Sequence, residues 1–507
     1  MQALPPLDTP GTIAFMWGAL RRGLSRAGLL AAGAALACAA PAGAAGQPPP
    51  SDAFGINGGA LFPDGNKTLP TARHTAAIGR SGLPSVRAVA WWDQIEPQAP
   101  DPRTGRHTYD WRLTDRIAEH LAREGLRWYV ILGFATAWSS TTPGFHFTPA
   151  RPGPFSEYAG AIARRYGRAG EFWRAHPELP YVPVQSFEVW NEPNLPFFWA
   201  PQPDPAAYAD LYLGAREAVH AVDPAARVVV GGLSHSGGES LDAPAFLRRM
   251  VAARPALRGR LDAVGVHVYA PTAEDVLDGV ADVRRALDEL GERDVLLDVT
   301  ETGWTTSGLQ PFTPGAVDEG RRSRLLTRLV ELLAGSDCGV VALLPYAWVT
   351  EENDRTAQAA WFGIADRATA ELKPSGGAFV AAVRDAARTA PSTACGRPDL
   401  PRLRTAPRAA APFDVRLARS CRARRLTVRL GPGAEPEPYA RVALELPDGR
   451  RRTLSDPDGS GPATAPREVR VRLPRRMGAV RAVAFDALGR ARATAEAALA
   501  RCPPRRR

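Results

Sequence analysis

The sequence predicts an α/β protein in which a (β/α)8 TIM barrel is followed by a small C-terminal all-β sandwich. Between residues 53 and 390, apolar runs of strand length alternate with segments whose apolar residues recur at helical spacing. Eight such units in one run favour a closed barrel over an open sheet. No Gly-x-Gly-x-x-Gly follows the first strand, which argues against a dinucleotide-binding fold.

The expected barrel strands are apolar runs that end in polar or Gly- and Pro-containing loops. They cover residues 53–57, 85–91, 128–133, 182–189, 227–232, 261–268, a run that begins at 295, and 339–346. The expected helices between them include 72–79, a helix that places Leu113, Ile117 and Leu121 on one face, 154–175 and 205–222. Asp204 is the expected N-cap of the last of these helices, with Pro205 at its first position.

The N-terminus has the pattern of an export signal. Arg21, Arg22 and Arg26 precede an apolar run over 29–40, and Ala42-Gly43-Ala44 fits the small-residue cleavage pattern. We therefore expect a signal peptide over 1–44, a leader over 45–52, and a protein that is secreted, extracellular or cell-wall associated. No later stretch is long and apolar enough to span a membrane.

Four cysteines remain once the signal peptide is removed, and four cysteines allow three pairings. We expect Cys338–Cys395, which would tie the start of the last barrel strand to the segment that leaves the barrel. We also expect Cys421–Cys502, which would close the tail domain. An oxidising exterior is compatible with both bonds.

The C-terminal part differs from the barrel in composition. A linker over 391–412, rich in Pro, Arg and Ala, leads to short alternating strands over 413–503, which is typical of a β-sandwich. Residues 396–507 hold 26 Arg against 11 acidic residues, while the whole chain has a net charge of +10. This asymmetry indicates an anionic cell-wall polymer as a partner. The alternative is a solvated Arg-rich surface.

Two glutamates stand at the ends of two separate predicted strands. Trp190-Asn191-Glu192-Pro193-Asn194 ends the fourth strand, and Thr300-Glu301-Thr302-Gly303-Trp304 ends the seventh. Barrel enzymes build their sites at the carboxyl ends of the strands. Glycoside hydrolysis needs two carboxyl groups, of which one protonates the leaving oxygen and the other attacks or stabilises the anomeric carbon.

These motifs together resemble those of the clan A glycoside hydrolases, and the local pattern is most similar to families 39 and 5. The resemblance covers about residues 52 to 390. It implies a retaining enzyme on a (β/α)8 barrel, with Glu192 as the acid/base and Glu301 as the nucleophile. An anionic Glu301 nearby would raise the pKa of Glu192, because two like charges resist joint ionisation.

The resemblance also implies roles for neighbouring residues. Asn191 would hydrogen-bond the sugar 2-hydroxyl, and Arg87 would support the nucleophile. His267 and Tyr269 alternate on the sixth strand and so share one face; in the family such residues line the site, with the tyrosine near the nucleophile.

Tryptophans gather at the predicted strand ends or in the loops that follow. Aromatic faces suit the C–H faces of pyranose rings, so we expect Trp92, Trp138, Trp304 and Trp348 to bind substrate. Trp304 and Trp348, just past the seventh and eighth strands, are the preferred stacking platforms. Trp91 and Trp199 belong to the same group by position.

The sequence thus predicts a secreted retaining O-glycoside hydrolase that cleaves β-glycosidic bonds of a poly- or oligosaccharide by double displacement. We expect no cofactor and no metal, because the histidines are scattered and no Cys pairs occur at ligand spacing. A nucleic-acid partner is not expected. The alternatives are a transglycosylase that uses the same glutamates and a non-catalytic carbohydrate- or cell-wall-binding protein.

Overall fold

A computed structural model describes most of the barrel and the strands of the tail. The described residues are 53–62, 69–140, 150–176, 178–235, 241–308, 315–403, 413–420, 425–432, 441–455, 467–472, 478–485 and 491–499. The expected signal peptide and leader, and the expected Cys421–Cys502 bond, lie outside these residues.

Eight parallel strands form one sheet in the order of the sequence, from β1 to β8. They are β1 (Gly55–Asn57), β2 (Ser85–Trp91), β3 (Arg127–Gly133), β4 (Ser186–Val189), β5 (Arg227–Ser234), β6 (Ala263–His267), β7 (Leu296–Glu301) and β8 (Val340–Leu343). The Leu343 amide donates to the Ala53 carbonyl at 2.7 Å, and the Asn57 amide donates to the Pro345 carbonyl at 3.0 Å. These bonds join the last strand to the first, so the predicted barrel is confirmed.

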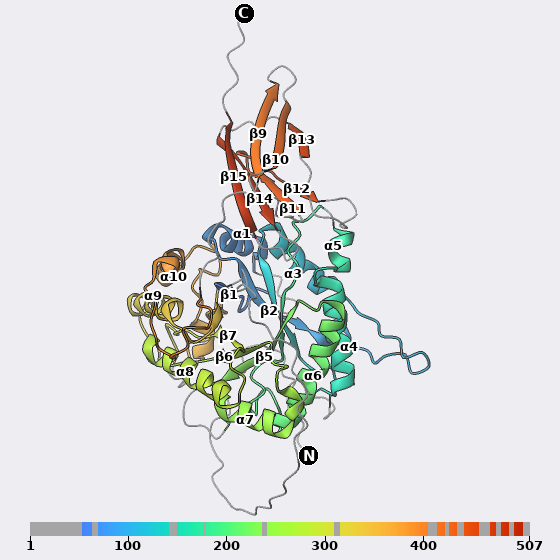
Figure 1. Ribbon diagram of the computed structural model, residues 1–507, viewed down its shortest axis with the longest axis vertical. Coiled ribbons are helices and arrows are strands. Elements are labelled where there is room, and N and C mark those ends of the chain that lie inside the picture. Colours follow the sequence, from blue (N-terminus) through green and yellow to red (C-terminus); the bar gives the residue numbers. More distant parts are fainter. Residues whose placement is uncertain are drawn as a thin grey trace, which may run out of the picture.

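Helices surround the strands, as Figure 1 shows. The helices are α1 (Thr71–Ser81), α2 (Trp92–Ile95), α3 (Arg112–Arg123), α4 (Pro152–Tyr166), α5 (Glu171–Ala175), α6 (Pro205–Val222), α7 (Ala243–Ala253), α8 (Ala273–Glu289), α9 (Glu319–Gly335) and α10 (Pro374–Asp385), with 3-10 turns at Pro255–Leu257, Gln358–Trp361 and Ala386–Arg388. The predicted cap of α6 is confirmed, because the Asp204 carboxylate accepts from two amides of its first turn. None of the described helices combines the length and apolar character needed to cross a bilayer.

The predicted helix over 154–175 is instead two helices, α4 and α5. Gly167 and Gly170 lie between them, and a Cβ on either would meet a backbone oxygen at 2.5 Å. The chain therefore turns sharply at these two glycines, which helical periodicity alone does not reveal.

The barrel interior has an apolar layer and a charged layer. Tyr129, Val229, Ala263, Ala342 and Leu344 form a small buried cluster, separate from the larger core between strands and helices. Since side chains alternate along a strand, this cluster fills the barrel lumen. Fully buried Asp298 accepts a hydrogen bond from the Tyr129 hydroxyl at 2.7 Å and pairs with Arg227 at 2.8 Å.

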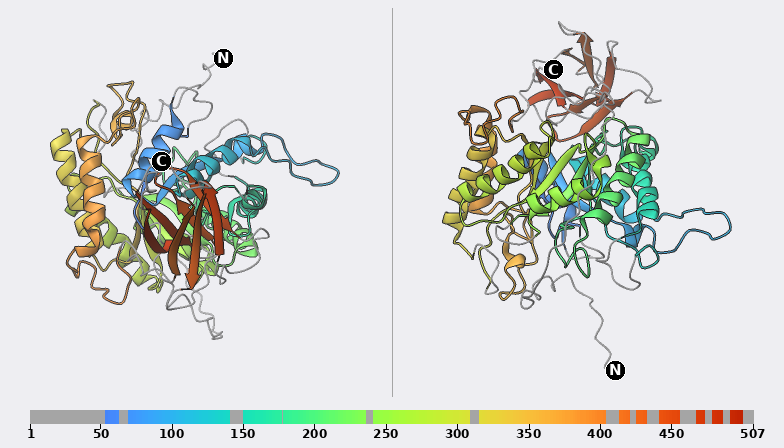
Figure 2. Two further views of the ribbon diagram at one scale, coloured as in Figure 1. Left: turned by 90° about the horizontal axis from the view of Figure 1, so that it is seen from above. Right: turned by 60° about the horizontal axis from the view of Figure 1, so that its bottom comes forward.

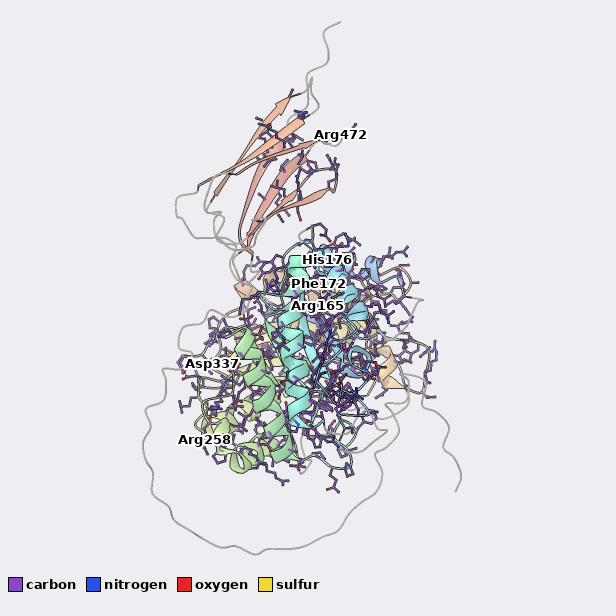
Figure 3. All side chains as sticks on the ribbon, turned by 90° about the vertical axis from the view of Figure 1, so that its right-hand side faces the viewer. Arg165, Phe172, His176, Arg258, Asp337 and Arg472 are labelled. Atoms are coloured by element: carbon purple, nitrogen blue, oxygen red, sulfur yellow. A yellow bond between two sulfur atoms is a disulfide. The ribbon has the colours of Figure 1, made fainter. Side chains whose placement is uncertain are left out.

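The tail is a β-sandwich of two antiparallel sheets, as predicted. One sheet has the order β13-β10-β9 and the other β12-β11-β14-β15. The strands are β9 (Phe413–Ser420), β10 (Arg425–Pro432), β11 (Arg441–Glu445), β12 (Arg451–Ser455), β13 (Arg467–Arg472), β14 (Gly478–Phe485) and β15 (Ala491–Leu499). The sandwich projects from one side of the barrel in Figure 1 and in the right-hand view of Figure 2. Figure 3 places Arg472 in this projecting part and Arg165 on the barrel.

The first part of the predicted linker is packed against the barrel. The predicted Cys338–Cys395 disulfide is confirmed. The Asp337 carboxylate accepts from the backbone amides of Cys395 and Arg397, both at 2.8 Å. Leu403 is fully buried. Residues 395–403, within the expected linker, therefore pack against the barrel at the amino-terminal end of β8.

We predict that a chain ending at residue 403 keeps a barrel as stable as that of the full chain, whereas a chain ending at 390 does not. The shorter chain loses the disulfide, which closes a segment of 57 residues and is worth about 4 kcal/mol by loop entropy. Urea unfolding followed by circular dichroism measures the difference. Equal stability of the two truncated chains would contradict a stabilising role for residues 395–403.

Candidate active site

Glu192 and Glu301 meet above the carboxyl ends of β4 and β7. One carboxylate oxygen from each glutamate and a ring nitrogen of His267 all lie within 4.8 Å of one another. The two glutamate side chains are 13% and 15% exposed, so both reach the surface of the barrel mouth. The predicted pairing of these residues in space is therefore present.

Glu301 is held by three donors from three strands or strand ends. Arg87 Nη1 donates to Oε1 at 2.6 Å, and the Tyr269 hydroxyl donates to Oε2 at 2.8 Å. Asn57 Nδ2 is 3.4 Å from Oε1. The carboxylate therefore has a fixed orientation before any substrate is present.

Arg87 is almost fully buried, and its guanidinium contacts residues on several barrel strands at once. Its Nε donates to Glu188 at 2.6 Å and its Nη2 donates to the side-chain oxygen of Asn191 at 2.9 Å. A single guanidinium thereby joins β2 to β4, to the residue that precedes Glu192, and to Glu301 on β7. The planar fork of arginine suits this role because it offers five donors in fixed directions.

Glu192 leaves β4 through an unusual backbone. The φ angles of Trp190 and Glu192 are +71° and +44°, in the left-handed region that side-chain-bearing residues rarely adopt. Such a conformation costs on the order of 1–3 kcal/mol per residue and persists where surrounding contacts fix it. Here the Trp190 amide donates to Leu132 at 2.9 Å and the Glu192 amide donates to Gly232 at 3.1 Å. These bonds to β3 and β5 direct the Glu192 carboxyl over the barrel.

The environment separates the acidities of the two carboxyl groups. Burial, together with the charge of Glu301, raises the pKa of Glu192 above its usual value, despite a hydrogen bond with His267. Burial acts in the same direction on Glu301, but His267, Arg87 and the Tyr269 hydroxyl outweigh it and lower the pKa of Glu301. The site therefore favours a protonated Glu192 beside an ionised Glu301.

Glu188 is a buried member of the site that the sequence analysis did not identify. It accepts from Arg87 Nε at 2.6 Å, from the Gly232 amide at 2.8 Å and from the Thr300 hydroxyl at 3.0 Å. The available signal was an acidic residue inside the apolar run of β4, where an unpaired charge would be costly. Asn57, at the end of β1, was missed as well and offered no comparable signal.

Three of the four predicted stacking tryptophans are in the core, which contradicts their assignment. Trp92, Trp304 and Trp348 have at most 1% of their surface exposed. The indole of Trp304 donates to the Ala270 carbonyl, and that of Trp348 donates to His74. Their rings pack between strands and helices and present no face to a ligand.

Trp92 and Trp138 are tied to the connection that follows β2. Trp92 stacks on Tyr158 and donates to the Glu96 carboxylate at 2.8 Å. Trp138 is half-buried, and its indole donates to the Glu96 carbonyl at 2.9 Å. Both indoles therefore support this connection, and Trp138 alone of the four keeps some exposed surface.

Other aromatic side chains occupy the barrel mouth. We call Trp91, Phe134, Phe197 and Phe198, which follow the ends of β2, β3 and β4, the aromatic rim. Phe134 lies 5.4 Å from Trp91 and stacks on Phe198 at 5.9 Å. Phe197 is 38% exposed, and Trp91 and Phe198 are half-buried. The Phe198 carbonyl accepts from the Trp190 indole at 2.8 Å, which ties the backbone of the rim to the side chain of the residue two positions before Glu192.

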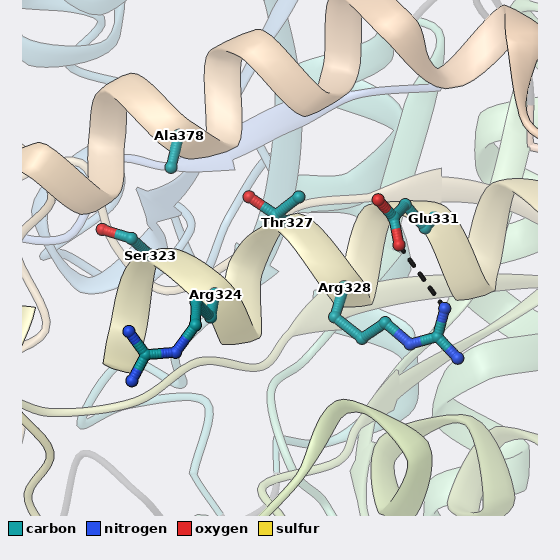
Figure 4. A pocket seen from close by; sticks show the side chains of 6 residues that line it. All are labelled: Ser323, Arg324, Thr327, Arg328, Glu331 and Ala378. Carbon is teal, nitrogen blue, oxygen red and sulfur yellow. Dashed lines mark hydrogen bonds and ion pairs between the residues drawn. The ribbon is translucent and has the colours of Figure 1, made fainter. Parts of the chain in front are cut away.

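Two surface depressions lie outside the glutamate cluster. One, of about 270 Å³, is lined by Ser323, Arg324 and Thr327 of α9 and by Ala378 of α10 (Figure 4). A groove of about 630 Å³ follows β2 and includes Tyr109 and Trp111. Neither contains a residue of the Glu192–Glu301 cluster.

Acidic, histidine and cysteine side chains that could hold a metal converge at two places in the described part of the chain. One such group is Glu192, His267 and Glu301; the other contains Asp337 with both cysteines of the disulfide. The Arg87 guanidinium lies 2.6 Å from Glu301, so a cation bound at the first group would sit beside a positive charge and be repelled by the guanidinium. The sulfurs of the second are already bonded to each other. Neither donor set suits a catalytic metal.

Comparison with solved structures supports the fold. The chain is similar to a glucosidase from Croceicoccus marinus, with 16% identity and a TM-score of 0.50 over 81% of this chain and 82% of that one. It is also similar to a GH39 β-xylosidase from Caulobacter crescentus, with 19% identity and a TM-score of 0.47 over 84% and 95% of the two chains. The likeness to the glucosidase agrees with the (β/α)8 fold that the strand order shows and that the resemblance implied.

Sequence comparisons add no family assignment. No protein-family model matches the chain. A search of curated proteins finds no match either.

We predict that Arg87→Met destabilises the protein by about 3–5 kcal/mol, because it leaves two buried carboxylates without their cation. Part of the loss should be recovered on acidification, since a protonated carboxyl needs no counter-charge. Urea unfolding at several pH values tests both effects. The control is Arg112→Met, which removes an exposed ion pair with Asp110 and should leave the stability nearly unchanged, because solvent screens that pair. A similar loss in both variants would contradict the central role of Arg87.

Proposed function

We propose that this protein is an exported retaining O-glycoside hydrolase that cleaves β-glycosidic bonds of a poly- or oligosaccharide. The observation that carries the proposal is the approach of Glu192 and Glu301, whose nearest carboxylate oxygens are within 4.8 Å. Retaining enzymes place their carboxyl groups about 5–5.5 Å apart, whereas inverting enzymes need about 6.5–9.5 Å to admit a water. The separation here leaves no room for that water.

In the first step, a Glu301 carboxylate oxygen attacks the anomeric carbon while the bond to the leaving oxygen breaks. Glu192 donates its proton to that oxygen, so the product leaves as an alcohol and a glycosyl-enzyme ester remains. The opposite pKa shifts of the two groups supply the required starting states, an ionised nucleophile and a protonated acid.

In the second step, Glu192 accepts a proton from water, and the resulting hydroxide oxygen attacks the anomeric carbon. The bond to Glu301 breaks and its carboxylate is restored. Esterification has meanwhile removed the negative charge of Glu301, which lowers the pKa of Glu192 and lets it act as a base. Two inversions at one carbon give net retention.

Substrate contacts are proposed for the groups that open onto the glutamates. Asn191, oriented by Arg87, would bind the sugar 2-hydroxyl. Tyr269, which donates a hydrogen bond to Glu301, would lie beside the attacking carboxylate during the reaction. The aromatic rim replaces Trp304 and Trp348 as the proposed stacking surface. It lies on the Glu192 side, where the leaving group departs.

Export and the partner of the tail remain part of the proposal. The expected signal peptide would deliver the chain to an oxidising exterior, which is compatible with the Cys338–Cys395 bond. The Arg-rich tail would hold the enzyme on an anionic cell-wall polymer. Hydrolysis in a panel of aryl glycosides and polysaccharides tests the activity itself, and acceptor products would indicate a transglycosylase instead.

We predict that the two glutamates fail differently when replaced. Glu192→Ala should keep the first step for dinitrophenyl glycosides, whose leaving group needs no proton, and azide should accelerate the slow second step. Glu301→Ala should abolish hydrolysis even of these substrates, since no covalent intermediate forms. Stopped-flow and steady-state kinetics measure both effects.

The wild-type enzyme should release the sugar first in its original anomeric form, which proton NMR detects before mutarotation. An inverted first product, or near-normal turnover by Glu301→Ala, would overturn the assignment of the nucleophile.

We predict that Phe198→Ala raises KM for oligosaccharides about two- to tenfold with little change in kcat, because it removes one stacking face of about 0.5–1.5 kcal/mol. Its backbone bond to Trp190 is unaffected by the substitution. Phe198→Tyr keeps the face and should behave like the wild type. A loss in kcat with an unchanged KM would indicate that the rim supports the backbone of Glu192 and does not bind sugar.

A further inference from the structure

A buried chain of hydrogen bonds leads from Glu192 to the barrel interior. His267 Nδ1 lies 2.9 Å from Glu192 Oε1, and His267 Nε2 lies 3.1 Å from the Thr300 hydroxyl. The Thr300 hydroxyl in turn donates to Glu188 at 3.0 Å. The side chains of His267, Thr300 and Glu188 are buried. The direction of each bond in this chain fixes which nitrogen of His267 carries a proton.

Glu188 acts only as an acceptor in this chain. Its two other partners, Arg87 Nε and the Gly232 amide, are obligatory donors at 2.6 and 2.8 Å. Oε2 thus accepts from the guanidinium and Oε1 from the amide, so each oxygen of Glu188 already faces a hydrogen that it must accept. The single hydroxyl proton of Thr300 therefore points to Glu188.

Thr300 consequently offers a lone pair to His267. Nitrogen Nε2 satisfies it by carrying a proton. When the proton shared by Nδ1 and Glu192 lies on Nδ1, His267 is charged and lowers the pKa of Glu301, as described above. When that proton lies on Glu192, as the acid step requires, His267 is neutral and Nδ1 is unprotonated. That nitrogen faces Glu192 at 2.9 Å, so it accepts a hydrogen bond from the protonated carboxylic acid and has no hydrogen to donate to the carboxylate.

One contact favours the opposite arrangement. Arg87 Nη2 lies 3.4 Å from Nε2 and would donate to it if that nitrogen were unprotonated. The contact is longer than the Thr300 bond, and the same Nη2 already donates to Asn191 at 2.9 Å. The Thr300 contact therefore determines the tautomer.

We propose that Glu188 and Thr300 are positioning residues that hold His267 as the Nε2–H tautomer, so that Glu192 is kept protonated for the first step of the proposed glycosidase reaction. The same arrangement serves the second step. An anionic Glu192 receives no hydrogen bond from neutral Nδ1 and is therefore a stronger base toward water. This inference rests on the proposed function, but the tautomer itself can be observed without any activity.

Other ionisable groups also lie near the two ring nitrogens of His267. Glu301 Oε2 is 3.7 Å from Nδ1, and it already accepts from the Tyr269 hydroxyl. Arg87 faces Nε2 from β2, and Glu188 and Glu192 come from β4 and its end. Tyr346 is coupled electrostatically to both Glu301 and Glu192 from beyond β8. Of these groups only Arg87 competes with Thr300 for Nε2.

The test compares the wild type with Thr300→Val, which keeps the shape and removes the hydroxyl, and Thr300→Ser, which keeps the hydroxyl. In Thr300→Val, we expect Nε2 to lose its proton and accept from Arg87, and Nδ1–H to donate to Glu192. The pKa of Glu192 then falls, and the basic limb of kcat/KM for a poor leaving group moves to lower pH by about one unit. The limb for dinitrophenyl glycosides should stay in place, because their departure needs no proton. Thr300→Ser should match the wild type in both assays.

Nitrogen-15 NMR of histidine-labelled wild-type protein reads the tautomer directly, with His267→Gln used to assign the signals. A protonated Nε2 and an unprotonated Nδ1 support the proposal, and the reverse pattern in the wild type overturns it even if the valine variant fails to fold. An unmoved basic limb in active Thr300→Val also overturns it. A wild-type protein with this tautomer but no activity on any glycoside refutes the proposed function and leaves the tautomer assignment standing.

Discussion

The site depends on one buried cation. Arg87 places a guanidinium inside the mouth of the barrel, where an isolated charge would be unstable, and three acceptors from β4, its end and β7 compensate for the lost water. The charges of Glu188 and Glu301 outweigh the effect of burial and raise the pKa of Arg87 above its already high value. Removal of any one acceptor would leave the others around an incompletely paired charge. The strands are thus locked in register by electrostatics as well as by backbone bonds.

This arrangement also explains how two neighbouring glutamates differ. Arg87 contacts Glu301 directly but reaches Glu192 only through the surrounding field, and the nearest polar partner of Glu192 is a histidine. Burial therefore dominates for Glu192, whereas charge dominates for Glu301. The difference required for the acid and nucleophile roles therefore arises from the surroundings of each carboxyl group: burial raises the pKa of Glu192, whereas His267, Arg87 and the Tyr269 hydroxyl lower that of Glu301.

The aromatic side chains fall into two groups: some stabilise the core, and others keep exposed surface at the barrel mouth. Indoles such as those of Trp304 and Trp348 donate to neighbours in the core, so they stabilise the connections after β7 and β8. In the aromatic rim, Trp91, Phe197 and Phe198 keep exposed surface beside β2 and β4. At the other end of the barrel, the disulfide and Asp337 secure the segment that leads to the tail. Core indole hydrogen bonds thus stabilise the barrel after β8, and the disulfide and Asp337 stabilise it before β8.

The alternation of strands and helices, the two glutamates at strand ends and the shared face of His267 and Tyr269 could be predicted from the amino-acid sequence alone. These follow from local periodicity, because a strand end and the parity of a residue on a strand depend on a few neighbouring residues. The break between α4 and α5, the burial of Trp304 and the role of Glu188 were decided only by tertiary structure. Glu188 receives its donors from β2, from β5 and from Thr300 on β7, which are up to 112 residues away in the chain. Exposure and hydrogen-bond partnership depend on which distant segments pack around a side chain, and a local sequence pattern carries no record of them.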